Sequence, residues 1–224
     1  MSFENNMLPV QLSQASGSIV FPGVRIAFSG TGGLPQPGSF LSDEELLFLN
    51  SLRLEKRRLE WQAGRLAAKK LIAGMSKKDM PSLAVSYDAM HRPVCGGFPV
   101  SITHSGGLAA AAYSESGIIG IDLEIIKPHS LRLAEDYFLE EEIPCTDAEN
   151  IVMAWTRKEA LLKALGLGLT VPAKSINAAG EKPVFFGKAL ERYKKLGSPD
   201  LRIMTARING KGKEGWFFSV AAEI

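Results

Sequence analysis

Gly120-Ile121-Asp122-Leu123-Glu124-Ile125 alternates branched apolar residues with small or acidic ones, the pattern of a β-strand with one buried face. The apolar residues are expected to face the core, and Gly120 leaves the opposite face uncrowded. Asp122 and Glu124 lie on that opposite face about 7 Å apart, close enough to share one cation. A half-exposed strand with solvated acids would have the same pattern, so the stretch alone leaves both interpretations open.

Downstream of this strand, residues 150–165 have the periodicity of an amphipathic helix. Lys158 falls inside the apolar stripe of that helix, and Glu159 and Lys163 lie along its edge, one turn apart. A solvated Glu–Lys pair at this spacing would stabilise the helix by about 0.3–0.5 kcal/mol and would need no function. That alternative does not explain the lysine inside the stripe, because buried charges need partners. We therefore favour a site where two lysines meet a phosphate and the glutamate meets a metal.

Two upstream segments add basic groups. A helix expected over residues 54–73 has Arg57 and Arg65 roughly 80° apart in projection, which gives a basic stripe along one side. His104 ends an expected strand just before a glycine-containing turn, where loops commonly hold functional groups. A solvated charged face and a structural histidine are the alternatives for these segments. The chain has 3 histidines, and their spacing does not suit a histidine-rich transition-metal site.

Helical and strand patterns occur together in both halves of the chain, which predicts an α+β fold. A capping box of Ser42 and Glu45 announces a first helix, before those over residues 54–73 and 150–165. Strands are expected over residues 23–28, 82–87, 99–103, 108–113, 118–126, 182–186, 201–208 and 216–222. The turn Ser114-Glu115-Ser116-Gly117 divides the chain into an N-terminal lobe, residues 1–114, and a C-terminal lobe, residues 115–224.

Composition excludes several classes of protein. A net charge of +2 is too small for a general nucleic-acid binder, so any basic site must be local. No apolar run approaches the roughly 18 residues of a membrane span. The first ten residues lack the pattern of a signal peptide, and the 2 cysteines are too few for a disulfide framework. We expect a cytoplasmic protein that binds neither nucleic acid nor membranes.

Taken together, these segments resemble the larger, two-lobed 4′-phosphopantetheinyl transferases that activate peptide and polyketide synthases. The hallmark of that family is a G-[IV]-D-[IVL]-E strand followed by W-x-x-K-E-A/S-x-x-K, and Gly120–Glu124 and Trp155–Lys163 match every defining position. The pair is specific, although either motif alone would be common. Similar upstream segments are Arg57-Arg58, Ala63-Gly64-Arg65, Arg92-Pro93 and Ile102-Thr103-His104-Ser105. The resemblance covers residues 40–170.

The resemblance implies an enzyme, a holo-[acyl-carrier-protein] synthase. It would move the phosphopantetheine arm of coenzyme A to a serine of an apo acyl, peptidyl or aryl carrier protein and release adenosine 3′,5′-bisphosphate. It also implies a monomer of two similar α/β lobes in a pseudo-two-fold arrangement, with the active site in the cleft between them.

The family pattern also implies a role for each matching residue. Asp122, Glu124 and Glu159 would hold Mg²⁺, and Glu159 would be the general base, either directly or through a metal-bound water. Lys158 and Lys163 would neutralise the coenzyme A diphosphate, and Lys163 would also stabilise the leaving group. The coenzyme A nucleotide and its 3′-phosphate would be bound by Arg57, Arg65, Arg92 and His104.

The sequence departs from the family pattern at two positions. Thr103 replaces the more usual serine before the histidine but keeps the hydroxyl, and Phe48 stands where some relatives have a nucleotide-binding arginine, with Arg53 nearby. Two other functions remain open. An unrelated Mg²⁺-dependent phosphotransferase should have a phosphate-binding glycine loop, and we find no convincing one. A non-catalytic module that binds carrier proteins would have no use for Glu159 and Lys163 on a partly buried edge.

Overall fold

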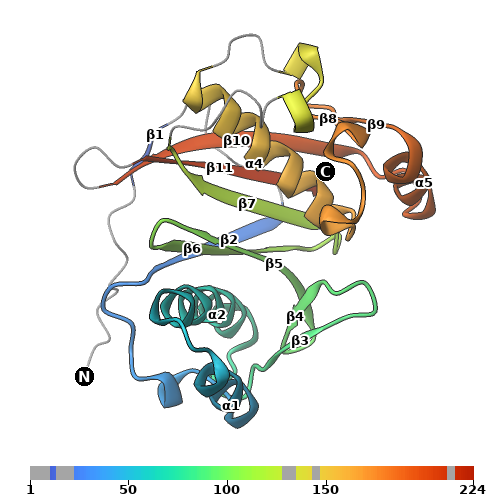
Figure 1. Cartoon of the computed structure of the whole chain (residues 1–224). Coiled ribbons are helices and arrows are strands. Elements are labelled where there is room, and N and C mark those ends of the chain that lie inside the picture. Colours follow the sequence, from blue (N-terminus) through green and yellow to red (C-terminus); the bar gives the residue numbers. More distant parts are fainter. Residues whose placement is uncertain (1–10, 14–22, 128–134, 143–146, 211–214) are drawn as a thin grey trace.

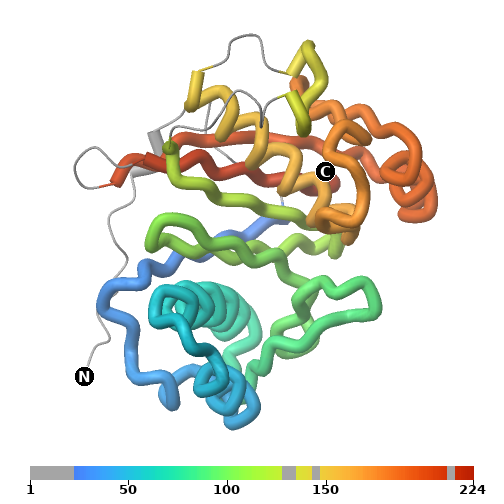
Figure 2. The backbone as a smooth tube through the Cα atoms, in the orientation of Figure 1, coloured from blue at the N-terminus to red at the C-terminus, as the bar shows by residue number. Residues whose placement is uncertain are grey.

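The computed structural model describes residues 11–13, 23–127, 135–142, 147–210 and 215–224 (Figure 1). It confirms the α+β class: two antiparallel sheets lie face to face, and one long helix covers the outer face of each (Figure 1). From β2 onward, the chain completes the first sheet and its helices before it enters the second sheet and its long helix, as the colours of the tube in Figure 2 show.

The first sheet has the strand order β2-β6-β5-β4-β3. The long helix α2 packs on it through Ala67, Ala68 and Ile72, which meet Val100 and Ala111 of the sheet. The short helix α1 packs beside α2, and Ser42 and Glu45 form the expected capping box at its start. The bounds of this half are β2 Val24–Gly30, α1 Asp43–Ser51, α2 Glu55–Ser76, β3 Val85–Tyr87, β4 Pro93–Cys95, β5 Phe98–Ser105 and β6 Leu108–Ser114.

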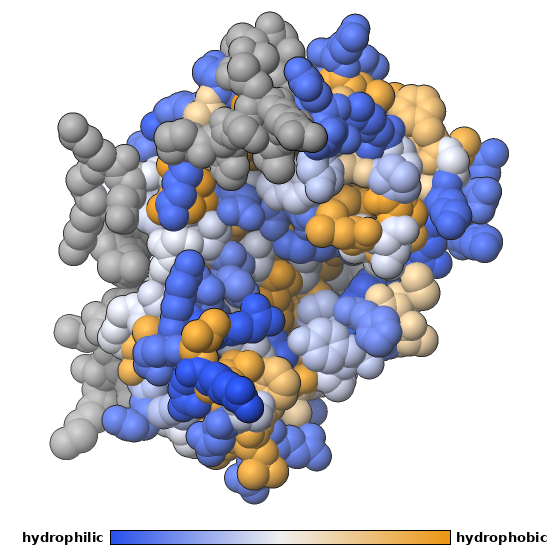
Figure 3. All heavy atoms as spheres, in the orientation of Figure 1, coloured by the Kyte–Doolittle hydropathy of each residue, from blue (hydrophilic) through white to orange (hydrophobic). Residues whose placement is uncertain are grey.

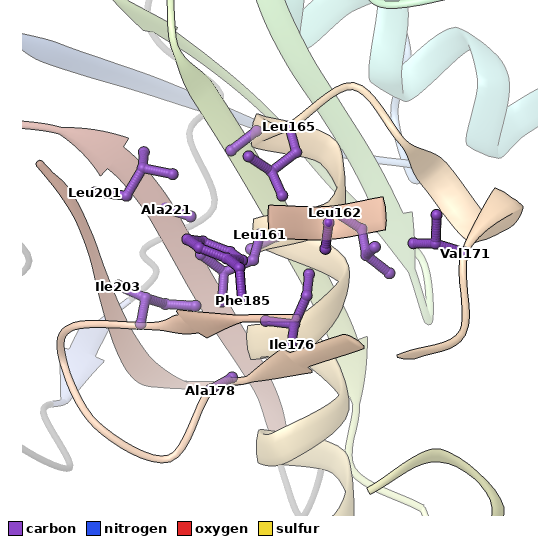
Figure 4. Close-up of a cluster of buried hydrophobic side chains, with 13 residues drawn as sticks. Leu161, Leu162, Leu165, Val171, Ile176, Ala178, Phe185, Leu201, Ile203 and Ala221 are labelled. Carbon is purple, nitrogen blue, oxygen red and sulfur yellow. The ribbon is translucent and has the colours of Figure 1, made fainter. Parts of the chain in front are cut away.

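The second sheet has the strand order β1-β10-β11-β7, and helix α4 covers it. Leu161 and Leu162 of α4 pack with Phe185, Ile203 and Ala221 in a dense apolar cluster (Figure 4). The bounds of this half are β1 Gln11–Ser13, β7 Ile119–Ile125, α4 Ala148–Ala164, β8 Ile176–Asn177, β9 Val184–Phe185, α5 Gly187–Lys195, β10 Leu201–Asn209 and β11 Gly215–Glu223. Short 3-10 turns are η1 Pro37–Ser39, η2 Glu140–Glu142, η3 Gly168–Thr170 and η4 Ala173–Ser175.

A third apolar cluster joins the inner faces of the two sheets. Ile121, Leu123 and Phe218 of the second sheet lie against Ala110 and Ala112 of the first. The apolar face of the Gly120–Ile125 strand therefore contacts the core, as its alternation predicted. Strands β2-β6-β5 of the first sheet and β7-β11-β10 of the second follow the same order, in which the last strand of each half lies between an earlier strand and the strand just before it in sequence. In each case the strand that precedes the long helix lies beside the last strand of its half.

Most of the expected elements are present, with a few differences. The strand expected over residues 82–87 is confined to β3, and the sequence reading missed β4, β8 and α5. The strand β1 pairs with β10 of the second sheet, although its residues were assigned to the N-terminal lobe. Among the described residues, no helix is both long enough and apolar enough to cross a membrane.

Candidate active site

The site begins where strand β7 meets helix α4, which are in direct backbone contact at Gly120. A Cβ atom added to Gly120 would lie 1.9 Å from the carbonyl oxygen of Ala160 and 2.4 Å from the backbone nitrogen of Ala164. Only glycine allows a helix to pack so closely on a strand. Because Asp122 and Glu124 share the Gly120 face of β7, they point to the side on which α4 presents its own charged groups.

On its other edge, β7 lies beside β5 of the first sheet, and three hydroxyl side chains join the two strands. The backbone N–H groups of Ile121, Leu123 and Ile125 donate to the hydroxyls of Ser101, Thr103 and Ser105, at 3.0, 3.2 and 3.1 Å. The constant offset of 20 residues means that the two strands run in the same direction. We call these three side chains the hydroxyl ladder.

Two rungs of the hydroxyl ladder also contact the carboxylates. Thr103 Oγ1 donates to Asp122 Oδ1 at 3.0 Å, and Ser105 Oγ donates to Glu124 Oε2 at 2.8 Å. Lys163 of α4 reaches the same Asp122 oxygen at 2.6 Å. The second carboxylate oxygen of Asp122, Oδ2, is buried and has no hydrogen-bond partner among the described residues. A buried carboxylate oxygen without a partner is available to a cation.

The acidic groups of this cluster repel one another. Burial raises the pKa of Glu124, and the charge of Asp122 adds to the rise, although the Ser105 hydrogen bond opposes it. Burial also raises the pKa of Glu159, where the charges of Asp122 and Glu124 add to the rise and Lys163 opposes it. Two acids with raised pKa values beside a third carboxylate form a region that would favour a bound cation.

The three carboxylates are nevertheless not gathered into a finished metal site. In the described part of the chain, no group of three His, Cys, Asp or Glu side chains is close enough to hold a metal ion. Lys163 lies against Asp122 and supplies the positive charge there. The donor set still suits Mg²⁺, which prefers hard oxygen ligands and takes several of them from phosphate and water.

His104 lies near this cluster but points away from the hydroxyl ladder, as alternation along β5 requires. Its Nδ1 is 3.8 Å from Glu60 Oε2 on α2, and its side chain is 39% exposed. Burial lowers the pKa of His104; Glu60 opposes this shift, and Lys163 and Arg57 add to it. Arg57, whose charge contributes to this shift, is exposed on α2. Hydrophilic side chains, among a few apolar ones, cover the face in front of α2 (Figure 3).

A pocket of about 530 Å³ adjoins Lys163 and takes its lining from both halves of the chain. Its volume is in the range of small-molecule sites. Arg92 lines the pocket and is held by Asp88, whose Oδ2 accepts from its Nε at 2.9 Å. The other lining residues are Ala89, Met90, His91, Pro93, Val100, Ser101, Ile102, Ile119, Gly166, Leu167, Gly168 and Thr170.

The structure gives Lys158 a different place from the one we expected. Its side chain is fully buried, its Nζ is 2.7 Å from Glu142 Oε2, and it also donates to the carbonyl oxygens of Ala173 and Ile176. Burial lowers the pKa of Lys158, and Glu142 opposes that shift. The lysine inside the apolar stripe therefore has its partners within the protein in this structure, and the prediction that it meets a phosphate receives no support from this geometry.

Arg65 is also held inside the protein. Its Nε is 3.5 Å from Glu45 Oε1, its guanidinium donates to the hydroxyl of Tyr87 at 2.9 Å, and it lies 4.7 Å from the centre of the Trp61 ring. Glu45 is buried between Arg65 and Lys69, and its carboxylate also forms an ion pair with Lys69. Of the two arginines expected along the basic stripe, Arg57 is exposed and Arg65 is buried in this structure.

Sequence reasoning missed the hydroxyl ladder, Glu45, Glu60 and Glu142. The alternation of Ser101, Thr103 and Ser105 along an expected strand was a visible signal that three hydroxyls share one face. Local patterns marked Glu45 only as a helix cap, and they did not indicate the tertiary ion pairs of these acids, because the partners in those pairs lie far along the chain.

One family model, described as the 4′-phosphopantetheinyl transferase N-terminal domain, matches residues 44–114. A second, described as the 4′-phosphopantetheinyl transferase superfamily, matches residues 118–187 and so includes β7 and α4. Together they match more than half of the chain, and the chain belongs to the 4′-phosphopantetheinyl transferase superfamily.

Curated relatives agree with this assignment. HetI of Nostoc sp. is 31% identical over 144 residues, AcpT of Salmonella typhi is 30% identical over 122, and ffp of Bacillus subtilis is 31% identical over 110. Each is named a 4′-phosphopantetheinyl transferase, and the matches cover 58%, 49% and 46% of this chain. The matches span 61%, 60% and 49% of the length of these relatives.

Proposed function

We propose that the protein transfers the 4′-phosphopantetheine arm of coenzyme A to a serine of an apo carrier protein. The observation that carries the proposal is the cluster of Asp122, Glu124, Glu159 and Lys163 at the edge of a pocket lined by Arg92. Coenzyme A brings a diphosphate and a 3′-phosphate, which require separate cationic groups. The family assignment supports the same chemistry.

The carboxylates fit a bound Mg²⁺, because Asp122 has a buried oxygen without a partner in the described chain and because Glu124 and Glu159 carry raised pKa values. We propose that these three residues hold the ion, which would neutralise charge on the diphosphate. Lys163, whose side chain is 29% exposed, would turn from Asp122 toward the diphosphate once a cation takes its place.

In the transfer step, the carrier serine oxygen bonds to the phosphorus that bears the pantetheine arm, and the bond from that phosphorus to the second phosphate breaks. Glu159 takes the serine proton, for which a raised pKa suits it. Lys163 neutralises charge on the departing adenosine 3′,5′-bisphosphate. The rest of the work is positioning, as in other phosphoryl transfers.

For the nucleotide, we propose that Arg57 and His104 bind the 3′-phosphate and that Arg92 contacts the nucleotide in the pocket. Exposure of Arg57 and the half-exposed ring of His104 support this assignment. Arg65 and Lys158 are left out, since each has a buried acidic partner.

We also propose that the two lobes are related by a pseudo-two-fold axis and that the chain works as a monomer. The shared strand order of β2-β6-β5 and β7-β11-β10, each with one long helix on its outer face, supports an internal repeat. Superposition of the two helix–sheet units in an experimental structure would test the relation, and light scattering would test the monomer.

The deciding experiment incubates the protein with Mg²⁺, coenzyme A and purified apo carrier proteins of the acyl, peptidyl and aryl types. Intact-mass spectrometry should show a gain of one phosphopantetheine on a carrier, and Ser→Ala at the carrier's acceptor position should prevent it. Binding of carrier without any mass gain would favour the non-catalytic alternative. Comparison of kcat/KM across the carriers would identify the preferred class.

A further inference from the structure

The hydroxyl ladder does more than satisfy the free edge of β7. Thr103 Oγ1 accepts from the N–H of Leu123 and donates to Asp122, and Ser105 Oγ accepts from the N–H of Ile125 and donates to Glu124. Each hydroxyl has one donor hydrogen, and the N–H group that it accepts fixes which way that hydrogen can point. Both hydrogens are directed at carboxylates of the other sheet.

The ladder has a third rung that lacks this second contact. Ser101 Oγ accepts from the N–H of Ile121 at 3.0 Å, and among the described residues it contacts no carboxylate. The structure therefore contains two rungs that hold an acid and one that only joins the strands. Comparison of Ser101 with Thr103 and Ser105 can therefore distinguish the positioning of a carboxylate from simple contact between the strands.

We propose that Thr103 and Ser105 are positioning residues for the carboxylates of the site. Each fixes one oxygen of its acid, so that the other oxygen faces the place that a divalent cation would take; for Asp122 that other oxygen is the buried one without a partner in the described chain. Hydrogen bonds to metal-binding carboxylates commonly tune metal affinity 10- to 100-fold. Because the hydroxyls belong to the first sheet and the acids to the second, the acids are oriented only when the two sheets are in contact.

This inference rests on the proposed metal site, so its test measures metal binding and geometry and not transfer. Mn²⁺ serves as the probe, titrated by calorimetry into the full chain without coenzyme A. Thr103→Val keeps the shape and removes the hydroxyl, Thr103→Ser restores it, and Ser105→Ala removes the second. Ser101→Ala is the matched control, because it loses the same kind of bond to a backbone N–H.

Thr103→Val and Ser105→Ala should each weaken Mn²⁺ about 10- to 100-fold, and Thr103→Ser should bind within about threefold of wild type. Ser101→Ala should lower the melting temperature about as much as Ser105→Ala but leave Mn²⁺ affinity within about twofold of wild type. Equal loss of affinity in Ser101→Ala, or unchanged affinity in both hydroxyl-free variants, would overturn the proposal.

A second measurement does not depend on a metal. In a metal-free crystal structure of Ser105→Ala, the Glu124 carboxylate should leave its wild-type orientation, while Ser101→Ala should leave both acids in place. An unmoved Glu124 would contradict positioning even if wild-type protein bound Mn²⁺. Wild-type protein that binds no Mn²⁺, with Glu124 displaced in Ser105→Ala, would instead contradict the metal in the proposed function and keep the positioning role.

Discussion

Two lysines of the family motif, five positions apart on α4, should respond to substitution in opposite ways. Lys158 is fully buried against Glu142, whereas Lys163 is 29% exposed at the edge of the pocket. Replacement of Lys158 by Met should destabilise the fold and spare the chemistry. Replacement of Lys163 by Met should remove transfer and cost less stability.

The magnitudes follow from what each substitution leaves behind. Lys158→Met leaves Glu142 as a buried charge, since its side chain is only 1% exposed, and it also removes the donor from two carbonyl groups. Loss of one partner of a buried ion pair costs about 3–5 kcal/mol, which is about 6–20 °C in melting temperature for a chain of this size. Lys163 is 29% exposed, and Asp122 keeps its hydrogen bond from Thr103 when the lysine is lost, so Lys163→Met should cost about 1–2 kcal/mol.

The assay pairs thermal unfolding with two measurements made below the lower of the two melting temperatures, which are coenzyme A titration and transfer per folded molecule. Lys163→Met should lose at least a hundredfold in kcat/KM, while Lys158→Met stays within about threefold of wild type. Glu142→Gln in the Lys158→Met background should recover part of the lost stability, because it removes the buried charge. A Lys158→Met protein that melts like wild type but no longer binds coenzyme A would refute this reasoning.

Three further predictions concern the acids and the nucleotide. Asp122→Asn should keep its contact with the hydroxyl ladder and a wild-type circular dichroism spectrum. It should lose several kcal/mol of transition-state stabilisation, measured as the ratio of kcat/KM to that of wild type. Normal turnover at millimolar Mg²⁺ would exclude Asp122 from the site. Because burial raises the pKa of Glu159, its ionisation opposes folding, so metal-free stability should fall as pH rises through that pKa, and Glu159→Gln should reduce the fall in pH-dependent denaturant unfolding. A pH profile of stability that is unchanged in Glu159→Gln would contradict this role of Glu159. In calorimetric titration, Arg57→Ala should weaken the binding of coenzyme A about tenfold and that of dephospho-coenzyme A only slightly. Arg65→Ala should lower stability and affect the binding of both ligands alike, and Lys56→Ala, at an exposed position, is the control. A selective effect of Arg65→Ala on coenzyme A would reverse this assignment.

Local patterns predicted much of this fold. The alternation of the Gly120–Ile125 strand gave the correct buried face, and the capping box of Ser42 and Glu45 marked the correct start of α1. These patterns did not show which residue would be the tertiary partner of each charged side chain. Glu45 caps its own helix and also pairs with Arg65 on α2, a contact that depends on how α1 packs against α2.

The same limit applied to the site. Periodicity correctly placed Lys158 in the apolar stripe of α4, but it could not show that Glu142 would be the partner of that lysine. The hydroxyls of Thr103 and Ser105 were visible as an alternating pair, yet their contact with β7 arises only from the packing of one sheet beside the other. Motif spacing thus indicated which groups carry charge, and the fold decided which charges are left for a ligand.

The contact at Gly120 has a consequence for how this protein can vary. The distance between the acids of β7 and the charged groups of α4 is set by backbone atoms that touch, and not by the size of any side chain between them. Substitutions in the surrounding apolar clusters can therefore repack without changing the span across the site. Position 120 has no such freedom, since even alanine would push the helix away from the strand. In a library with all residues at this position, selection for transfer should return glycine alone, because the backbone of α4 occupies the place of any side chain at residue 120.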